Sequence, residues 1–336
     1  MMKTLLFLPS RNLALTIPIV LMAGFIVGLS VDTAGLKNYI LPVSMLMIYP
    51  IMIGFSIGEL LNLSHTRLIL TAGVINFAFI PLAAYLLGKV LLSHDPQLFA
   101  GLAVASLLPT SNMTIAFTMF TKGNVTASIK MTVAGLVAGS LLAPWYLLAM
   151  VGKYIPFDVL FIIKTLGIVV FIPLILGNIT YSFLLRKYTH EQFNRQIKPY
   201  LPAISAWGAI YIVFTSISIN AYRIVANPKL LLNGLLVQVI FYVINYFIVI
   251  KIGRHYFNKE DAISLVYGTV LRNLSISIGL AATAFGPRAA LMVSLAFLFQ
   301  GQAAAWFSRL VEKNKLRVGK EYKLNGSDHQ PVFRDG

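Results

Sequence analysis

This sequence contains no cysteine and few charged residues. The 336 residues contain no cysteine, which excludes disulfide bonds and thiolate metal sites. Only 11% of the residues are charged, whereas soluble globular domains carry about 25%. Hydrophobic residues make up 58% of the chain, so the composition predicts a polytopic membrane protein surrounded by the lipid bilayer.

Acidic residues are absent from the interior of the long apolar segments. All eleven lie in loops, in the tails or at segment ends: Asp32, Glu59, Asp95, Asp158, Glu191, Glu260, Asp261, Glu312, Glu321, Asp328 and Asp335. Proton-coupled carriers commonly relay protons through buried carboxylates, and many sodium sites contain a carboxylate. We therefore expect neither a proton relay nor a carboxylate-containing sodium site at mid-membrane. No HExxH or Asp-rich diphosphate pattern occurs, and we predict neither an enzyme nor a bound metal.

Ten segments are long and apolar enough to span a membrane, which takes about 20 residues. They lie at residues 12–31, 39–57, 68–90, 97–121, 125–150, 157–183, 200–220, 230–252, 261–284 and 288–310. Their short connections predict an all-α polytopic membrane protein without a soluble domain. Residues 1–10 form an N-terminal tail too short for a signal peptide, and residues 311–336 form a basic tail.

The net charge of +16 follows from membrane topology and does not indicate a nucleic-acid partner. Alternate loops hold most of the basic residues outside the C-terminal tail: Lys3, Arg11, Arg67, Lys122, Arg186, Lys187, Arg195, Lys198, Lys251, Arg254 and Lys259. The opposite loops hold only Lys37, Lys89, Lys153, Arg223, Lys229 and Arg288. Because such an excess faces the cytoplasm, we expect a multi-pass protein of the plasma (inner) membrane with both termini cytoplasmic.

The chain divides into two halves of five predicted helices, residues 11–152 and 157–310. The run Ile17-Pro18-Ile19 in the first helix is echoed by Ile172-Pro173-Leu174 in the sixth. Because five is odd, the second half must cross the membrane with the opposite topology to the first. That arrangement is typical of inverted-repeat secondary transporters.

The fourth helix of each half contains a polar, helix-breaking interruption. The first break runs from Pro109 to Thr114, and the second from Gly268 to Ser275. In lipid, every backbone polar group must be satisfied inside the protein, so unwound chain at this depth survives only where it lines a cavity. We therefore predict that helices four and nine are broken and that their breaks form the substrate site.

Three cations lie inside predicted spans. Lys130 and Lys164 lie near span ends, where each ammonium can extend to the interface. Arg272 lies near the centre of its span, where an arginine costs at least about 2.5–3.5 kcal/mol. Its planar, charged fork suits a carboxylate or another oxyanion. The alternative is that Arg272 only binds carbonyl groups freed by the break.

The predicted substrate-binding residues are the polar residues of the two breaks: Arg272, Asn273, Thr110, Ser111 and Asn112. Free amide groups at the start of each second half-helix would add affinity for negative charge. Gly135 and Gly139 form a GxxxG pattern, which predicts close helix packing.

The sequence around the first break resembles a known family. The run from Leu108-Pro109 to Lys122-Gly123-Asn124-Val125 and on to Ser128 and Thr132 resembles the bile acid:sodium symporter (BASS) family. The arsenite-efflux carriers of the same superfamily are also similar, and the likeness extends over most of residues 11–310. It implies ten transmembrane helices as two inverted five-helix repeats, a panel and a core domain, and broken helices 4 and 9 that cross beside the substrate cavity.

Only some of the family's sodium ligands are matched by residues of this chain. In the first site Thr114, Ser128 and Thr132 match hydroxyl ligands, but Ile115 replaces an asparagine and Gly268 replaces a glutamate. In the second site Asn76 and Arg272 each replace a glutamine, and Thr110-Ser111 replaces a Gly-Gly pair.

Asn76, Thr114, Ser128, Thr132 and Thr269 are therefore predicted to form a vestigial ion site, and a sodium ion is the only cofactor that the resemblance leaves open. Two like charges 4 Å apart repel by about 4 kcal/mol at an effective dielectric constant of 20. A guanidinium at this place would take the position of a sodium ion and repel another.

These observations predict a secondary transporter that carries a small anionic solute, such as an organic carboxylate, by alternating access with weak or no dependence on sodium. Three alternatives stay open. They are an arsenite or antimonite efflux carrier, a sodium-coupled bile-acid-type symporter, and a non-transporting receptor or scaffold. The efflux branch is disfavoured because it relies on a cysteine near the first break. The predicted partners are the solute and the bilayer, and the sequence specifies no oligomeric state.

Overall fold

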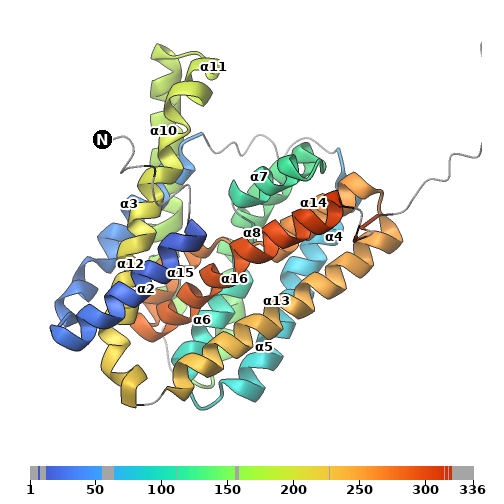
Figure 1. The fold of residues 1–336 in the computed structure, drawn as a ribbon. Helices are drawn as coiled ribbons and strands as arrows, with labels where there is room; N and C mark the ends of the chain where they lie inside the picture. The colour runs from blue at the N-terminus through green and yellow to red at the C-terminus, as the bar shows by residue number, and fades with distance from the viewer. Residues whose placement is uncertain are drawn as a thin grey trace, which may run out of the picture.

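A computed structural model describes residues 7, 13–54, 64–110, 112–155, 159–226, 228–313, 315–316 and 318–319 (Figure 1). In these residues the chain forms helices and no strand. The longer helices are α2 (Leu13–Ser30), α3 (Ile40–Met52), α5 (Ile80–Leu91), α6 (Pro96–Leu107), α8 (Val125–Val151), α10 (Ile172–Lys187), α12 (Tyr200–Ala226), α13 (Lys229–Tyr256), α14 (Lys259–Val270), α15 (Leu274–Ala284) and α16 (Pro287–Glu312). Shorter ones are α4 (Thr66–Val74), α7 (Asn112–Phe120), α9 (Val159–Leu166) and α11 (His190–Gln192).

Each of the ten predicted segments coincides with one or two of these helices. In the described part of the chain, five continuous helical segments are long and apolar enough to cross a membrane: Thr66–Leu91, Val125–Val151, Tyr200–Tyr222, Leu231–Tyr256 and Pro287–Glu312. Shorter apolar helices cover Thr16–Ser30, Pro96–Leu107 and Leu274–Ala284. The fold is therefore that of an all-helical multi-pass membrane protein, while the inverted repeat stays a prediction.

The helices form two groups that lie side by side (Figure 1). In the first group, α12 packs along α2 and α3, and α3 packs on α10. In the second group, α16 packs on α6 and α15, α13 packs on α14, and α6 packs on α5 and α8. Contacts of α15 with α3 and of α16 with α12 join the two groups.

Two prolines explain local widening of the helices. Each follows a five-residue π-helical segment: Pro81 follows Ile75–Phe79, and Pro173 follows Gly167–Phe171. Proline lacks an N–H group and its ring clashes with the carbonyl group four residues earlier, and the wider turn relieves that clash. The Tyr146 hydroxyl group donates to the Phe77 carbonyl oxygen inside the first of these segments.

Lys164 and Lys130, the two cations near span ends, differ in solvent exposure. Lys164 is exposed, as expected for a side chain that reaches the interface. Lys130 is only 1% exposed, and its ammonium group donates to the Ser64 hydroxyl and, over 3.3 Å, to the Ser64 carbonyl oxygen. Lys130 therefore differs from Lys164 in being buried against Ser64, which lies just before α4.

Glycines bring α8 against the first break, as the GxxxG pattern predicts. A Cβ atom on Gly139 would lie 2.6 Å from the Leu107 carbonyl oxygen, and one on Gly135 would lie 3.0 Å from the Pro109 ring. Both distances are shorter than a normal carbon contact. A larger residue at Gly139 must therefore displace backbone at the break.

We expect Gly139→Ala to lower the stability of the purified protein by about 1–3 kcal/mol, the usual cost of overpacking. The matched control is Gly73→Ala in α4, because a Cβ atom there would meet nothing within 4 Å. That change should be neutral or slightly stabilising. Scanning fluorimetry in detergent compares the two, and equal melting temperatures would contradict the close packing.

Candidate functional site

The two predicted breaks meet each other. Helix α6 ends at Leu107 and α7 begins at Asn112, while α14 ends at Val270 and α15 begins at Leu274. Pro109 and Arg272 form an isolated antiparallel β-bridge. The Thr110 amide donates to the Leu271 carbonyl oxygen over 2.9 Å, and the Asn273 amide donates to the Leu108 carbonyl oxygen over 2.9 Å. Each unwound segment thus satisfies backbone groups of the other, as the membrane interior requires.

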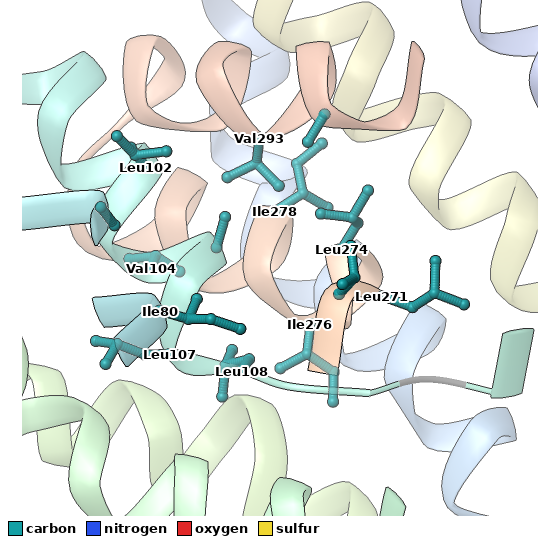
Figure 2. Packing of buried hydrophobic residues seen from close by; sticks show 14 of the residues in the cluster. Ile80, Leu102, Val104, Leu107, Leu108, Leu271, Leu274, Ile276, Ile278 and Val293 are labelled. Carbon is teal, nitrogen blue, oxygen red and sulfur yellow. The ribbon is translucent and has the colours of Figure 1, made fainter. Parts of the chain in front are cut away.

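Apolar side chains pack around this crossing (Figure 2). Leu107 and Leu108 come from the first break, Leu271 and Leu274 from the second, and all four are at most 2% exposed. Water is therefore kept from most of the backbone at the crossing. The hydrogen bonds between the breaks are consequently made in a low-dielectric surrounding, where they are stronger than in water.

Gln300 of α16 fixes the second break from the other side. Its Oε1 accepts from the Arg272 amide over 2.7 Å and from the Tyr242 hydroxyl group over 2.9 Å. Its Nε2 donates to the Arg272 carbonyl oxygen over 3.0 Å. The side-chain amide therefore pairs with the backbone as a neighbouring strand would. Gln300 was not among the predicted site residues, although a glutamine in the middle of an apolar span was an available signal.

The Arg272 side chain is fully buried and lies inside the crossing. Its Nη1 donates to Asn76 Oδ1 over 2.6 Å and to the Thr269 carbonyl oxygen over 2.9 Å. Its Nε donates to the Ala105 carbonyl oxygen over 3.2 Å, and its Nη2 donates to the Ser106 carbonyl oxygen. All three guanidinium nitrogens thus bind protein oxygens, and none of those oxygens belongs to a carboxylate.

Most of these acceptors belong to helix ends. Ala105 and Ser106 lie in the last turn of α6, and Thr269 lies in the last turn of α14. Carbonyl groups in the last turn have no partner within their own helix and carry the negative end of the helix dipole. The guanidinium therefore neutralises two converging C-terminal ends. In this conformation Arg272 binds carbonyl groups freed by the breaks. Anion binding by Arg272 stays a prediction.

The structure brings Asn76, Thr269 and Arg272 together. Asn76 binds Arg272 through its Oδ1 and donates from Nδ2 to the Gly268 carbonyl oxygen over 3.0 Å. Thr269 contributes its carbonyl oxygen to Arg272, while its hydroxyl group donates to the Leu265 carbonyl oxygen over 2.7 Å. The guanidinium thus lies within a shell of neutral oxygen atoms, the kind of ligand that hard cations take.

The hydroxyl groups of the predicted first ion site bind protein groups. Thr114 Oγ1 donates to the Tyr267 carbonyl oxygen over 3.3 Å, and Thr132 Oγ1 donates to the Ser128 carbonyl oxygen over 2.8 Å. Ser128 Oγ lies 2.8 Å from Thr118 Oγ1. A Cβ atom on Gly268 would lie 2.7 Å from Met131 Cε, so the Met131 thioether chain fills the space beside this glycine.

The predicted substrate residues have different surroundings. Thr110 is buried, has a φ of 62°, and donates its hydroxyl hydrogen to the Pro109 and Thr132 carbonyl oxygens. Asn273 is 6% exposed, and its Oδ1 caps α15 by accepting from the Ile276 amide over 3.2 Å. Asn112 begins α7, but its side chain, like the whole of Ser111, lies outside the described residues.

A cavity of about 120 Å³ lies against the second break, between the two helix groups. Its lining combines apolar residues with neutral polar ones: Ile51, Met113, Pro202, Ser205, Ala206, Ala209, Arg272, Asn273, Leu274, Ser275, Phe297 and Gln300. Ser275 is the only residue from Ala262 to Ala282 that is not buried. It therefore presents the start of α15 to the cavity. Ser275 and Ser205 were not among the predicted site residues, and only the helix register could have indicated Ser275.

We expect Arg272→Met to destabilise the protein strongly, by about 1–3 kcal/mol for each buried carbonyl group left without a donor. The matched control is Arg195→Met, because the Arg195 side chain is 79% exposed and its ion pair with Glu191 lies in solvent. That control should change stability by less than about 0.5 kcal/mol. Melting temperatures that fall equally in both variants would contradict the structural role of Arg272.

Comparison with known proteins identifies the family of this chain. A model of the "Sodium Bile acid symporter family" matches residues 41–227, a range that includes the first break and ends before the second. An uncharacterized protein YbaS of Bacillus subtilis is 27% identical over 265 residues, 76% of this chain and 82% of that protein.

Two plant proteins described as probable sodium/metabolite cotransporter BASS1, chloroplastic, are also similar. The Arabidopsis thaliana protein is 24% identical over 170 residues, 50% of this chain and 40% of that protein. The Oryza sativa protein is 26% identical over 154 residues, 46% of this chain and 36% of that protein. With the family model matching more than half of its residues, the chain belongs to the sodium bile acid symporter family and is a membrane solute transporter, not an enzyme.

Proposed function

We propose that this protein carries a small organic anion across the plasma membrane by alternating access, with a tethered guanidinium in place of a coupling sodium ion. The observation that carries the proposal is the placement of Arg272, buried in a shell of neutral oxygens at the crossing of the two broken helices. In a ten-helix inverted repeat, this crossing would lie near the middle of the bilayer.

The anionic character of the solute is supported by the orientation of the half-helices. The C-terminal ends of α6 and α14 face Arg272, whereas the N-terminal end of α15, which carries partial positive charge, lies beside the cavity. Ser275 and Asn273 line the cavity at the start of α15, and no acidic residue among those that the structure describes does so. Arg272 also lines it, which adds positive charge close to the solute.

The small size of the solute is supported by the cavity. Its volume of about 120 Å³ is well below the 300–1,000 Å³ of sites that hold drug-sized molecules. A carboxylate of a few carbon atoms fits such a space in this conformation, whereas a sterol-sized bile acid requires the two helix groups to separate. Because the cavity lies between those groups, their relative movement would open it to one side of the membrane at a time.

Weak dependence on sodium is supported by both predicted ion sites. The Arg272 guanidinium already occupies the shell of oxygen atoms, and its positive charge would repel an approaching sodium ion. In the other site, Gly268 supplies no carboxylate and Met131 fills the adjoining space. The few remaining hydroxyl groups form hydrogen bonds with protein oxygens, so a sodium ion would have to displace these hydrogen bonds.

Ser275→Leu should abolish solute binding, because the larger side chain fills the cavity beside α15. We expect acetate, pyruvate or succinate to raise the melting temperature of the wild type but not of this variant, and taurocholate and arsenite to have no effect. Ser182→Leu on the exposed face of α10 is the matched control and should keep the response. A response to arsenite alone would favour an efflux carrier, and no response to any probe would favour a scaffold.

Uptake of the stabilising carboxylate into proteoliposomes should be unchanged when choline replaces sodium. The reason is that the tethered guanidinium needs no ion from solution. Uptake that falls to background in choline would refute the tethered cation and favour a sodium-coupled symporter. Liposomes without protein supply the background rate.

A gain-of-function variant tests the same idea from the other direction. Gly268→Glu with Arg272→Gln and Met131→Ala restores a carboxylate, removes the guanidinium and makes room for the new side chain. We expect sodium, but not choline, to raise the melting temperature of this triple variant. Met131→Ala alone is the control and should show no sodium response. A sodium response of the wild type equal to that of the triple variant would contradict the proposal.

A further inference from the structure

We propose that the C-terminal end of α16 binds the headgroup of an anionic phospholipid. A second cavity, of about 360 Å³, lies there, far along α16 from the crossing. Its lining is Trp306, Arg309, Leu310, Lys313 and Lys315. The site is independent of the transported solute, since it shares no lining residue with the cavity beside Ser275.

Three cations converge on this cavity. Arg309 and Lys313 are four residues apart and lie on one face of α16. After Lys313 the chain folds back, because the Lys315 and Leu316 amides both donate to the Leu310 carbonyl oxygen, over 2.9 and 3.0 Å. This turn brings Lys315 to the same face. The concave shape therefore comes from the turn and not from the helix alone.

The charge of the cavity is not balanced by the residues around it. In the part of the chain that the structure describes, Arg309, Lys313 and Lys315 form no salt bridge. The nearest carboxylate in sequence, Glu312, accepts a hydrogen bond from Ser308 over 3.0 Å and does not line the cavity. A phosphate group is the complementary ligand, because its oxygen atoms accept from several ammonium and guanidinium groups at once.

Two exposed apolar residues identify the source of the phosphate as a lipid. Trp306 is 68% exposed and Leu310 is 42% exposed, and both line the same cavity. Trp306 lies on the membrane side of Arg309 along this spanning helix, and tryptophan is typical of the boundary between headgroups and acyl chains. The order of residues thus places Trp306 at acyl depth and Lys313 and Lys315 at headgroup depth, with Arg309 and Leu310 at the level between them. A soluble phosphate would leave Trp306 and Leu310 unused.

The test compares phosphatidylglycerol with phosphatidylcholine of the same acyl chains. We expect the full-length protein in mixed micelles to retain phosphatidylglycerol selectively in native mass spectrometry and to melt at a higher temperature with it. Arg309→Gln/Lys313→Gln/Lys315→Gln should reduce that preference by about 10- to 100-fold. Trp306→Ala should reduce it while leaving the charge unchanged.

A matched charge control uses Lys187→Gln/Arg195→Gln/Lys198→Gln, three exposed cations elsewhere. This variant should keep the preference for phosphatidylglycerol, and both triple variants should melt like the wild type in phosphatidylcholine. Glycerol 3-phosphate is the soluble probe and should not stabilise the protein. The proposal is overturned by equal losses in both triple variants, by a wild type without preference, or by full stabilisation with the soluble probe.

Discussion

The arrangement of this protein depends on the contact between one guanidinium group and the carbonyl ends of two half-helices. Where α6 and α14 stop inside the membrane, their last carbonyl groups lose their helical partners and carry partial negative charge. Arg272 supplies donors to Ala105, Ser106 and Thr269, and Asn76 and Gln300 hold it and its backbone in place. Without that cation, two negative helix ends would face each other in a medium of low dielectric constant.

The same geometry separates the two signs of charge at the crossing. Each broken helix contributes a negative end and a positive end, and the structure directs the negative ends to Arg272. The start of α15 is then turned to the cavity through Ser275. In the proposed mechanism, the fixed cation at the negative ends therefore would not compete with a solute at the positive ends. Arg272 would instead favour the binding of an anion. When it neutralises the negative C-terminal ends, the positive N-terminal ends dominate the electric field at the crossing.

Much of this could be predicted from the sequence, because membrane helices and breaks leave signals along the chain. Hydropathy located the helices, and the polar runs near Pro109 and Arg272 located the breaks. What could not be predicted depends on contacts between distant segments. The filling of space beside Gly268 by Met131, the pairing of Gln300 with the backbone of Arg272, and the burial of Lys130 under Ser64 are all tertiary contacts. No local pattern encodes them.

A tethered cation has an energetic consequence that a bound ion does not. A sodium ion binds from one side and leaves on the other, so its gradient adds free energy to each transport cycle. A guanidinium that stays in its oxygen shell throughout the cycle would make an interaction that is equal in all states, and such an interaction shifts no equilibrium between them. A carrier built on Arg272 would therefore move its solute down the gradient of that solute, or exchange one anion for another. In the proposed mechanism, replacing the ion by a side chain would keep the crossing stable and remove the coupling to sodium.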